Sequence, residues 1–130
     1  MPTHAVTWID RKEARIFHLH PDATDETTIL APQHHLHRHP LGPADVRGSA
    51  EDARRFFKEV ARALEGADAL LIVGPSSTKL EFFRYLHEHD RRLEAKVVGV
   101  ESADHPTDGE IVARARSCFA LSNETGSVAT

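Results

Sequence analysis

The sequence has little of what marks a secreted, membrane-spanning or disulfide-stabilised protein. Its one cysteine, Cys118, has no partner within the chain, which excludes an intramolecular disulfide framework and favours a reducing cytosol. The segment from Met1 to His4 contains neither a basic nor an apolar stretch, and the longest apolar run covers only residues 69–73. We therefore expect neither secretion nor membrane spanning, and we predict a cytoplasmic protein.

An excess of positive charge is also missing. The 130 residues include 16 Lys and Arg against 20 Asp and Glu, so the formal net charge is −4 with neutral histidines. This sign disfavours binding of nucleic acid through overall charge, and only a local basic patch is compatible with it. The 40% hydrophobic and 28% charged residues, with seven glycines and seven prolines, are typical of one globular domain.

Histidine is the residue type in excess. The chain has ten, and four of them lie between residues 34 and 39. Because histidine titrates near neutrality, protonation of half of them would reverse the net charge. The cluster belongs to residues 33–48, which lack hydrophobic periodicity and contain Pro40 and Pro43, so we predict a long irregular loop there.

The hydrophobic pattern predicts a single α/β domain over residues 1–121, followed by a flexible tail over 122–130. Strands are predicted as an antiparallel N-terminal meander and two buried parallel strands, over residues 5–10, 14–20, 26–30, 69–73 and 96–100. Helices are predicted over residues 49–66, from Thr78 onward and from Thr107 to residue 121, with a short turn at 91–95. Each main helix begins at a capping pair: Ser49 with Asp52, Thr78 with Glu81, and Thr107 with Glu110.

This order predicts a ribonuclease-H-like mixed sheet of about five strands, with a parallel β-α-β unit and about three helices. A two-metal nuclease on such a sheet needs several carboxylates that converge on its centre. Asp10 is the one acid near the middle of the first hairpin, and no acid interrupts residues 69–73 or 97–100. We therefore do not expect a nuclease.

In an open α/β sheet, ligands bind beyond the carboxyl ends of the parallel strands. After residue 73, hydroxyl residues and a lysine stand at a predicted helix N-terminus, where free amides and the helix dipole favour a phosphate or carboxylate. The candidate anion- and RNA-binding residues there, and on the basic strip that follows, are Gly74, Ser76, Ser77, Thr78, Lys79, Arg84, Arg91 and Arg92.

Two alternatives stand beside this anion site. The hydroxyl residues of the turn are also the usual helix caps and need no ligand. The segment after residue 100 supplies Glu101, Asp104 and His105, which would form a small hydrolase site if they converged, although turn and cap chemistry accounts for them as well. The turn lacks the second glycine and the Gly-Lys-Ser/Thr order of a nucleotide-hydrolysing loop, so we do not predict nucleotide hydrolysis.

The histidines allow three interpretations. Clustered imidazoles chelate zinc, nickel or copper, and the candidate ligands are His35, His37, His39, His18 and His20. The loop is alternatively a pH-sensitive phosphate contact together with Arg38 and Arg47, or a solvated tract with no specific ligand. No cysteine joins the set and no finger spacing occurs, so zinc or nickel is the one cofactor class that the sequence raises, without deciding it.

Four motifs also carry a family resemblance. Residues 71–82 (LIVGPSSTKLEF) resemble the strand, Gly-Pro-Gly-x-x-Lys-x-x-Phe turn and helix in the middle domain of archaeal and eukaryotic peptide chain release factors and of Pelota. Residues 6–17 (VTWIDRKEARIF) resemble the hairpin that opens that domain. With residues 97–101 (VVGVE) and 104–108 (DHPTD), the chain is similar, over residues 5–120, to small bacterial release-factor-like proteins described as translational machinery proteins.

The resemblance implies a non-enzymatic, translation-related module whose partner is the ribosome or structured RNA. It departs from the family at two places. The Gly-Gly-Gln motif of release factors is absent, and the corresponding loop, 33–48, carries histidines, so peptidyl-tRNA hydrolysis is not implied. Ser76 stands where the family's turn often has glycine. The alternative function is metal binding by the cluster at 34–39.

Overall fold

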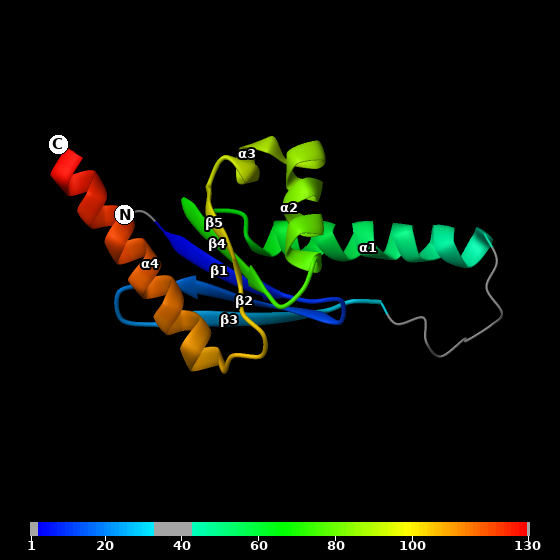
Figure 1. Cartoon of the computed structure of the whole chain (residues 1–130), viewed down its shortest axis with the longest axis horizontal. Coiled ribbons are helices and arrows are strands. Elements are labelled where there is room, and N and C mark those ends of the chain that lie inside the picture. Colours follow the sequence, from blue (N-terminus) through cyan, green and yellow to red (C-terminus); the bar gives the residue numbers. More distant parts are fainter. Residues whose placement is uncertain (1–2, 33–42, 130) are drawn as a thin grey trace.

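The computed structural model describes the backbone of residues 3–32 and 43–129, with the side chains of 3–32 and 51–120. Strands and helices alternate after an all-β start (Figure 1). In chain order they are β1 (His4–Ile9), β2 (Glu13–Leu19), β3 (Thr24–Leu30), α1 (Pro43–Ala63), β4 (Ala69–Gly74), α2 (Thr78–His89), α3 (Arg91–Glu94), β5 (Val97–Ser102) and α4 (Asp108–Ala129).

The strands form one mixed sheet in the order β3-β2-β1-β4-β5. β2 runs antiparallel to both β1 and β3, whereas β4 runs parallel to both β1 and β5. The predicted N-terminal meander and parallel β-α-β unit are therefore confirmed. The prediction of a single α/β domain, consistent with a ribonuclease-H-like sheet, is confirmed as well.

Helices cover both faces of this sheet. α1 and α2 pack on one face and α4 on the other, and Figure 1 shows them on opposite sides of the strands. The first face buries apolar side chains from both helices against the sheet, chiefly Phe56, Phe57, Val60, Leu64, Phe82 and Leu86. The second buries a smaller set from α4 and the strands, chiefly Val6, Trp8, Phe17, Ile111, Ala115 and Phe119. Because β1 and β4 lie between these two layers, nearly every residue in them is buried, which explains their continuous apolar runs.

The predicted capping pair of the last helix is confirmed. The Thr107 amide donates to Glu110 Oε1 at 2.8 Å, and the Glu110 amide donates to Thr107 Oγ1 at 3.1 Å. This reciprocal capping box satisfies two backbone donors that the first turn of α4 would leave unpaired.

Three predicted helix boundaries were wrong. α1 begins at Pro43 and not at Ser49, because a proline suits the first turn of a helix, where no intrahelical acceptor is lost. α2 has Ser77 as its N-cap, and Thr78 lies inside the helix. α4 continues past residue 121 to Ala129, since no proline interrupts its hydrogen bonds; the flexibility of residues 122–130 stays a prediction.

We predict that Gly74→Ala destabilises the protein by about 1–3 kcal/mol, because a Cβ at this position would overlap the backbone carbonyl oxygen of Ile9. Gly109→Ala is the matched control. The nearest atom to its new Cβ is Thr107 Oγ1 at 3.9 Å, and alanine favours the helix. Urea denaturation of both variants measures the difference. Equal unfolding midpoints for Gly74→Ala and the unsubstituted chain would contradict the tight contact.

Candidate nucleic-acid interface

The carboxyl ends of three parallel strands meet at one end of the sheet. β1, β4 and β5 point the same way, so the segments that follow Ile9, Gly74 and Ser102 lie together there (Figure 1). Two hydrogen bonds join these segments: the Ala103 amide donates to the Gly74 carbonyl at 3.0 Å, and Trp8 Nε1 donates to the Ala103 carbonyl at 3.2 Å. This is the end of the sheet at which the sequence predicted a ligand site.

The turn between β4 and α2 presents a helix N-terminus at this end. The Ser77 hydroxyl does not cap a backbone amide; it donates to Glu81 Oε2 at 3.0 Å. The first amides of an α-helix have no acceptor within the helix, and the helix dipole adds positive potential there. The Leu80 and Glu81 amides donate to the Ser77 carbonyl, each at 2.9 Å, so the amides of Thr78 and Lys79 are those left without an acceptor among the described hydrogen bonds. The Glu81 carboxylate lies in the same turn.

Two predicted site residues point inward instead of toward solvent. Lys79 is 8% exposed, and its Nζ donates to the Ser76 carbonyl at 2.6 Å. Thr78 is 2% exposed, and its hydroxyl has no hydrogen-bond partner among the described residues. The ammonium charge thus lies against the turn itself, where it holds the loop in shape and adds positive potential without protruding.

The predicted basic strip is exposed along α2 and α3. Arg84, Arg91 and Arg92 all lie at the surface. Arg91 Nε donates to the His87 carbonyl at 3.1 Å, while His87 Nδ1 is 2.8 Å from Glu94 Oε2. Arg92 and Lys96 line a polar depression of about 480 Å³ together with the carboxylates of Glu65 and Asp90.

Sequence reasoning missed two further groups of cations. Arg11 and Lys12 are exposed in the β1–β2 turn, which follows the Ile9 carbonyl that touches Gly74. The second group consists of exposed cations of α1 that line the hollow between α1 and α2: Arg54, Arg55 and Lys58. The placement of the α1 cations depends on which helices pack together, so the sequence does not show it. The basic pair at 54–55, between the apolar positions of the predicted helix, was nevertheless a sign in the sequence of a cationic surface on this helix.

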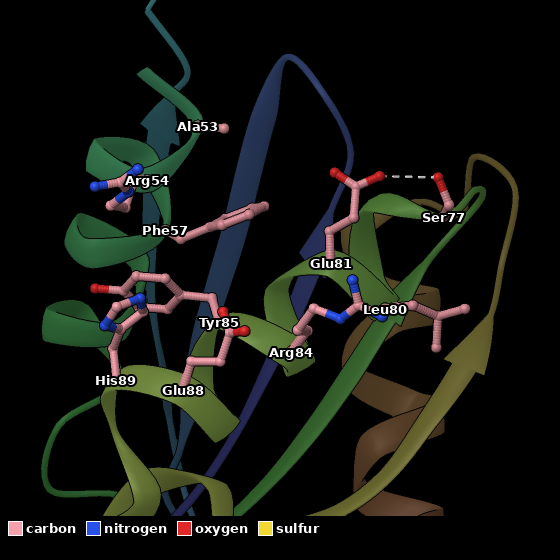
Figure 2. A pocket seen from close by; sticks show the side chains of 10 residues that line it. All are labelled: Ala53, Arg54, Phe57, Ser77, Leu80, Glu81, Arg84, Tyr85, Glu88 and His89. Carbon is pink, nitrogen blue, oxygen red and sulfur yellow. Dashed lines mark hydrogen bonds between the residues drawn. The ribbon is translucent and has the colours of Figure 1, made fainter. Parts of the chain in front are cut away.

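The hollow between α1 and α2 has a volume of about 450 Å³ (Figure 2). Figure 2 shows Tyr85 and His89 side by side against α1, with Phe57 and Arg54 next to them. The Tyr85 and His89 rings are 4.8 Å apart, and the Tyr85 and Phe57 rings are 5.8 Å apart. Burial raises the pKa of the Tyr85 phenol, so the phenol keeps its proton.

The acidic segment after β5 shows structural contacts. Arg114 donates from Nε and Nη2 to the two carboxylate oxygens of Glu101, each at 2.7 Å, and so ties α4 to β5. Asp104 Oδ1 is 3.1 Å from Nδ1 of the adjacent His105. Asp108 accepts from Arg15 Nη1 at 2.8 Å, which lowers the pKa of that carboxyl. None of the described hydrogen bonds joins Glu101 to Asp104 or His105.

The predicted metal ligands are only partly described. His18 Nε2 lies 2.7 Å from the Ala63 carbonyl at the end of α1, and His20 Nε2 lies 2.9 Å from Asp25 Oδ2. His35, His37 and His39 lie outside the described residues. In the part of the chain that the structure describes, no three His, Cys, Asp or Glu side chains are grouped so as to hold a metal ion.

Known structures match this arrangement over most of the chain. Pelota from Archaeoglobus fulgidus superposes with a TM-score of 0.62 at 16% identity, over 98% of this chain and 37% of that one. Pelota from Thermoplasma acidophilum superposes with a TM-score of 0.57 at 20% identity, over 83% of this chain and 30% of that one. An archaeal translation termination factor superposes with a TM-score of 0.62 at 15% identity, over 95% of this chain and 40% of that one. The fold is Pelota-like.

The Pelota-like fold accounts for less than half of each of those chains, so the present chain spans only a part of their length. No protein-family model matches the sequence, and no curated protein matches it either. Among the described residues, none of the helices combines the length and apolar character needed to cross a lipid bilayer.

The Glu101–Arg114 pair makes stability depend on pH. The Arg114 guanidinium lowers the pKa of Glu101 in the folded state, so the pair stabilises the fold above the ordinary carboxyl pKa and less as pH falls through the folded-state value. We expect Glu101→Gln to be less stable than the unsubstituted chain near about pH 7, and to approach its stability only as pH falls below the folded-state pKa of Glu101, which lies under the ordinary carboxyl value. Glu59→Gln, on the exposed side of α1, is the control.

Urea denaturation across this pH range measures the gap in unfolding free energy for each variant. A gap for Glu101→Gln that persists unchanged into acid would contradict the assignment of this carboxylate to a structural ion pair.

Proposed function

We propose that this chain is a cytoplasmic, non-enzymatic module of translation that associates with the ribosome or with structured RNA. The observation that carries the proposal is the Pelota-like fold, which extends over 98% of the chain for one Pelota and 95% for a translation termination factor. Residues 71–82, which resemble the strand, turn and helix of the same proteins, cover the end of β4, the β4–α2 turn and the start of α2. The turn lies at the carboxyl ends of the parallel strands, where open α/β sheets bind their ligands.

The proposed contact is with the phosphate backbone. Unpaired amides at the start of α2 bind a phosphate oxygen, and the exposed guanidinium groups of Arg84, Arg91 and Arg92 continue the contact along α2 and α3. Lys79 contributes through its charge beneath the turn, because its ammonium is bonded to the Ser76 carbonyl. Arg11 and Lys12 extend the cationic surface on the β1 side of the turn.

This surface reconciles RNA binding with a net charge of −4. The basic groups begin at the β4–α2 turn and continue along α2 to α3, at the opposite end of the sheet. The carboxylates of Glu101 and Asp108 are paired with Arg114 and Arg15. Phosphate contacts release counterions, so the proposed association weakens as salt rises.

The turn is tested by Ser76→Asp, which places a carboxylate beside the amides that would bind phosphate. We expect the ribosome-bound fraction in co-sedimentation at low salt to fall by about threefold or more. Ser117→Asp makes the same charge change on the exposed side of α4 and should leave binding unchanged. Equal binding of the two variants would remove the turn from the interface.

The basic strip is tested separately by Arg92→Glu. Reversal of one exposed charge should reduce ribosome binding by about fivefold and flatten its salt dependence. Arg62→Glu, an exposed site at the end of α1, is matched in charge and in helix exposure. If the unsubstituted chain stays in the supernatant at low salt, the proposed function itself is wrong.

A further inference from the structure

The hollow between α1 and α2 has an aromatic floor that the proposed phosphate contact does not use. His89 is exposed and rests on Tyr85 at 4.8 Å between ring centroids, and Tyr85 in turn packs on Phe57. The exposed His89 ring is therefore supported from behind by other rings (Figure 2). A supported flat ring at the surface is what base stacking requires.

Cations surround this floor. A second hollow of about 400 Å³ adjoins the first along α1, and the two share Arg54, Tyr85 and His89. Together they are lined by four permanent cations and three carboxylates: Arg54, Arg55, Lys58, Arg84, Glu51, Glu81 and Glu88. The positive groups are in excess by one.

We propose that the α1–α2 hollow is a subsite for one nucleotide unit, whose base stacks on the His89–Tyr85 pair while Arg54 binds its phosphate. This inference rests on the proposed function and narrows how the chain would hold RNA. Lys58 and Arg55 lie along α1 where the next phosphates of a strand would pass. The carboxylates are compatible with this ligand, because they accept hydrogen bonds from base amino groups and from the ribose 2′-hydroxyl.

The combination of groups favours a nucleotide over a simple anion. An inorganic phosphate or polyphosphate would use the guanidinium groups but would leave the aromatic rings without a role, and the carboxylates would repel it. The protonated Tyr85 phenol adds a hydrogen-bond donor within the hollow. A base with its phosphate uses all of these groups at once.

Fluorescence anisotropy with a labelled RNA octamer of adenylate tests the subsite. We expect His89→Ala to weaken binding about tenfold, and His89→Phe, which keeps a flat ring, to stay within about twofold of the unsubstituted chain. Arg54→Ala should weaken binding about fivefold and lower the salt slope by about 0.7. Arg62→Ala, on the same helix but outside both hollows, is the control.

Competition separates the sources of the nucleotide. Unlabelled octamer and adenosine monophosphate are each used to displace the labelled octamer. If the unlabelled octamer does so at a concentration at least about tenfold lower, the subsite is assigned to an RNA strand. If the two competitors displace it at equal concentrations, the subsite is assigned to a free nucleotide. Either result supports the subsite, provided that the binding is lost in His89→Ala. Inorganic polyphosphate that competes as well as the octamer does would show that charge alone binds, which overturns the proposal.

The failures of the two proposals are distinguishable, because neither His89 nor Arg54 belongs to the proposed ribosome-binding turn or strip. Octamer affinity that is absent, or unchanged in His89→Ala and Arg54→Ala, overturns the subsite whatever the ribosome assay shows. Octamer binding that depends on His89, in a chain that does not sediment with ribosomes, overturns the proposed function and leaves the subsite standing.

Discussion

The contact between Gly74 and the carbonyl of Ile9 is the constraint on which the rest of this structure depends. It lets the end of β4 lie directly against the end of β1, closer than any side chain at position 74 would allow. From there the Gly74 carbonyl accepts from Ala103, and the Ala103 carbonyl accepts from the Trp8 indole, so three strand ends form one connected unit. The turns that follow these strands are thereby placed side by side, and the first turn of α2 is presented at a fixed position.

Helices cover both faces of the central strands β1 and β4, whereas β3 at the edge of the sheet is exposed. α1 and α2 bury one face, and α4 buries the other and is held at its start by Arg15, which bonds to Asp108 and stacks over Trp8 at 4.4 Å from the ring centroid. The exposed surfaces also include the turns at the strand ends and the outer sides of the helices. The cations occupy those surfaces, along α2 and α3 and across the hollow from α1, which is how an acidic chain comes to carry a basic patch.

Much of this was predictable from local pattern, and the remainder depends on packing. The strands at 69–73 and 96–100 follow from the hydrophobic pattern, and the capping box at Thr107 follows from a short-range hydrogen-bond pairing. All three were predicted. The start of α1 was missed because a proline marks a loop or a first helical turn equally well. The inward position of Lys79 was not foreseeable, because it depends on the shape of the β4–α2 turn, where its ammonium bonds to the Ser76 carbonyl. The meeting of Arg54, Tyr85 and His89 at one hollow was not foreseeable either, because it depends on how α1 and α2 approach each other.

The most direct test of the account is the RNA cross-linking pattern of a photoreactive residue placed at opposite ends of the sheet. One variant carries benzoylphenylalanine at Ser76, in the β4–α2 turn, and the other carries it at Asp22, in the β2–β3 turn at the far end. Irradiation of ribosome-bound chain should yield cross-links to ribosomal RNA from position 76 and none from position 22. RNA cross-links from position 22 alone would contradict the claim that this fold meets RNA through the β4–α2 turn.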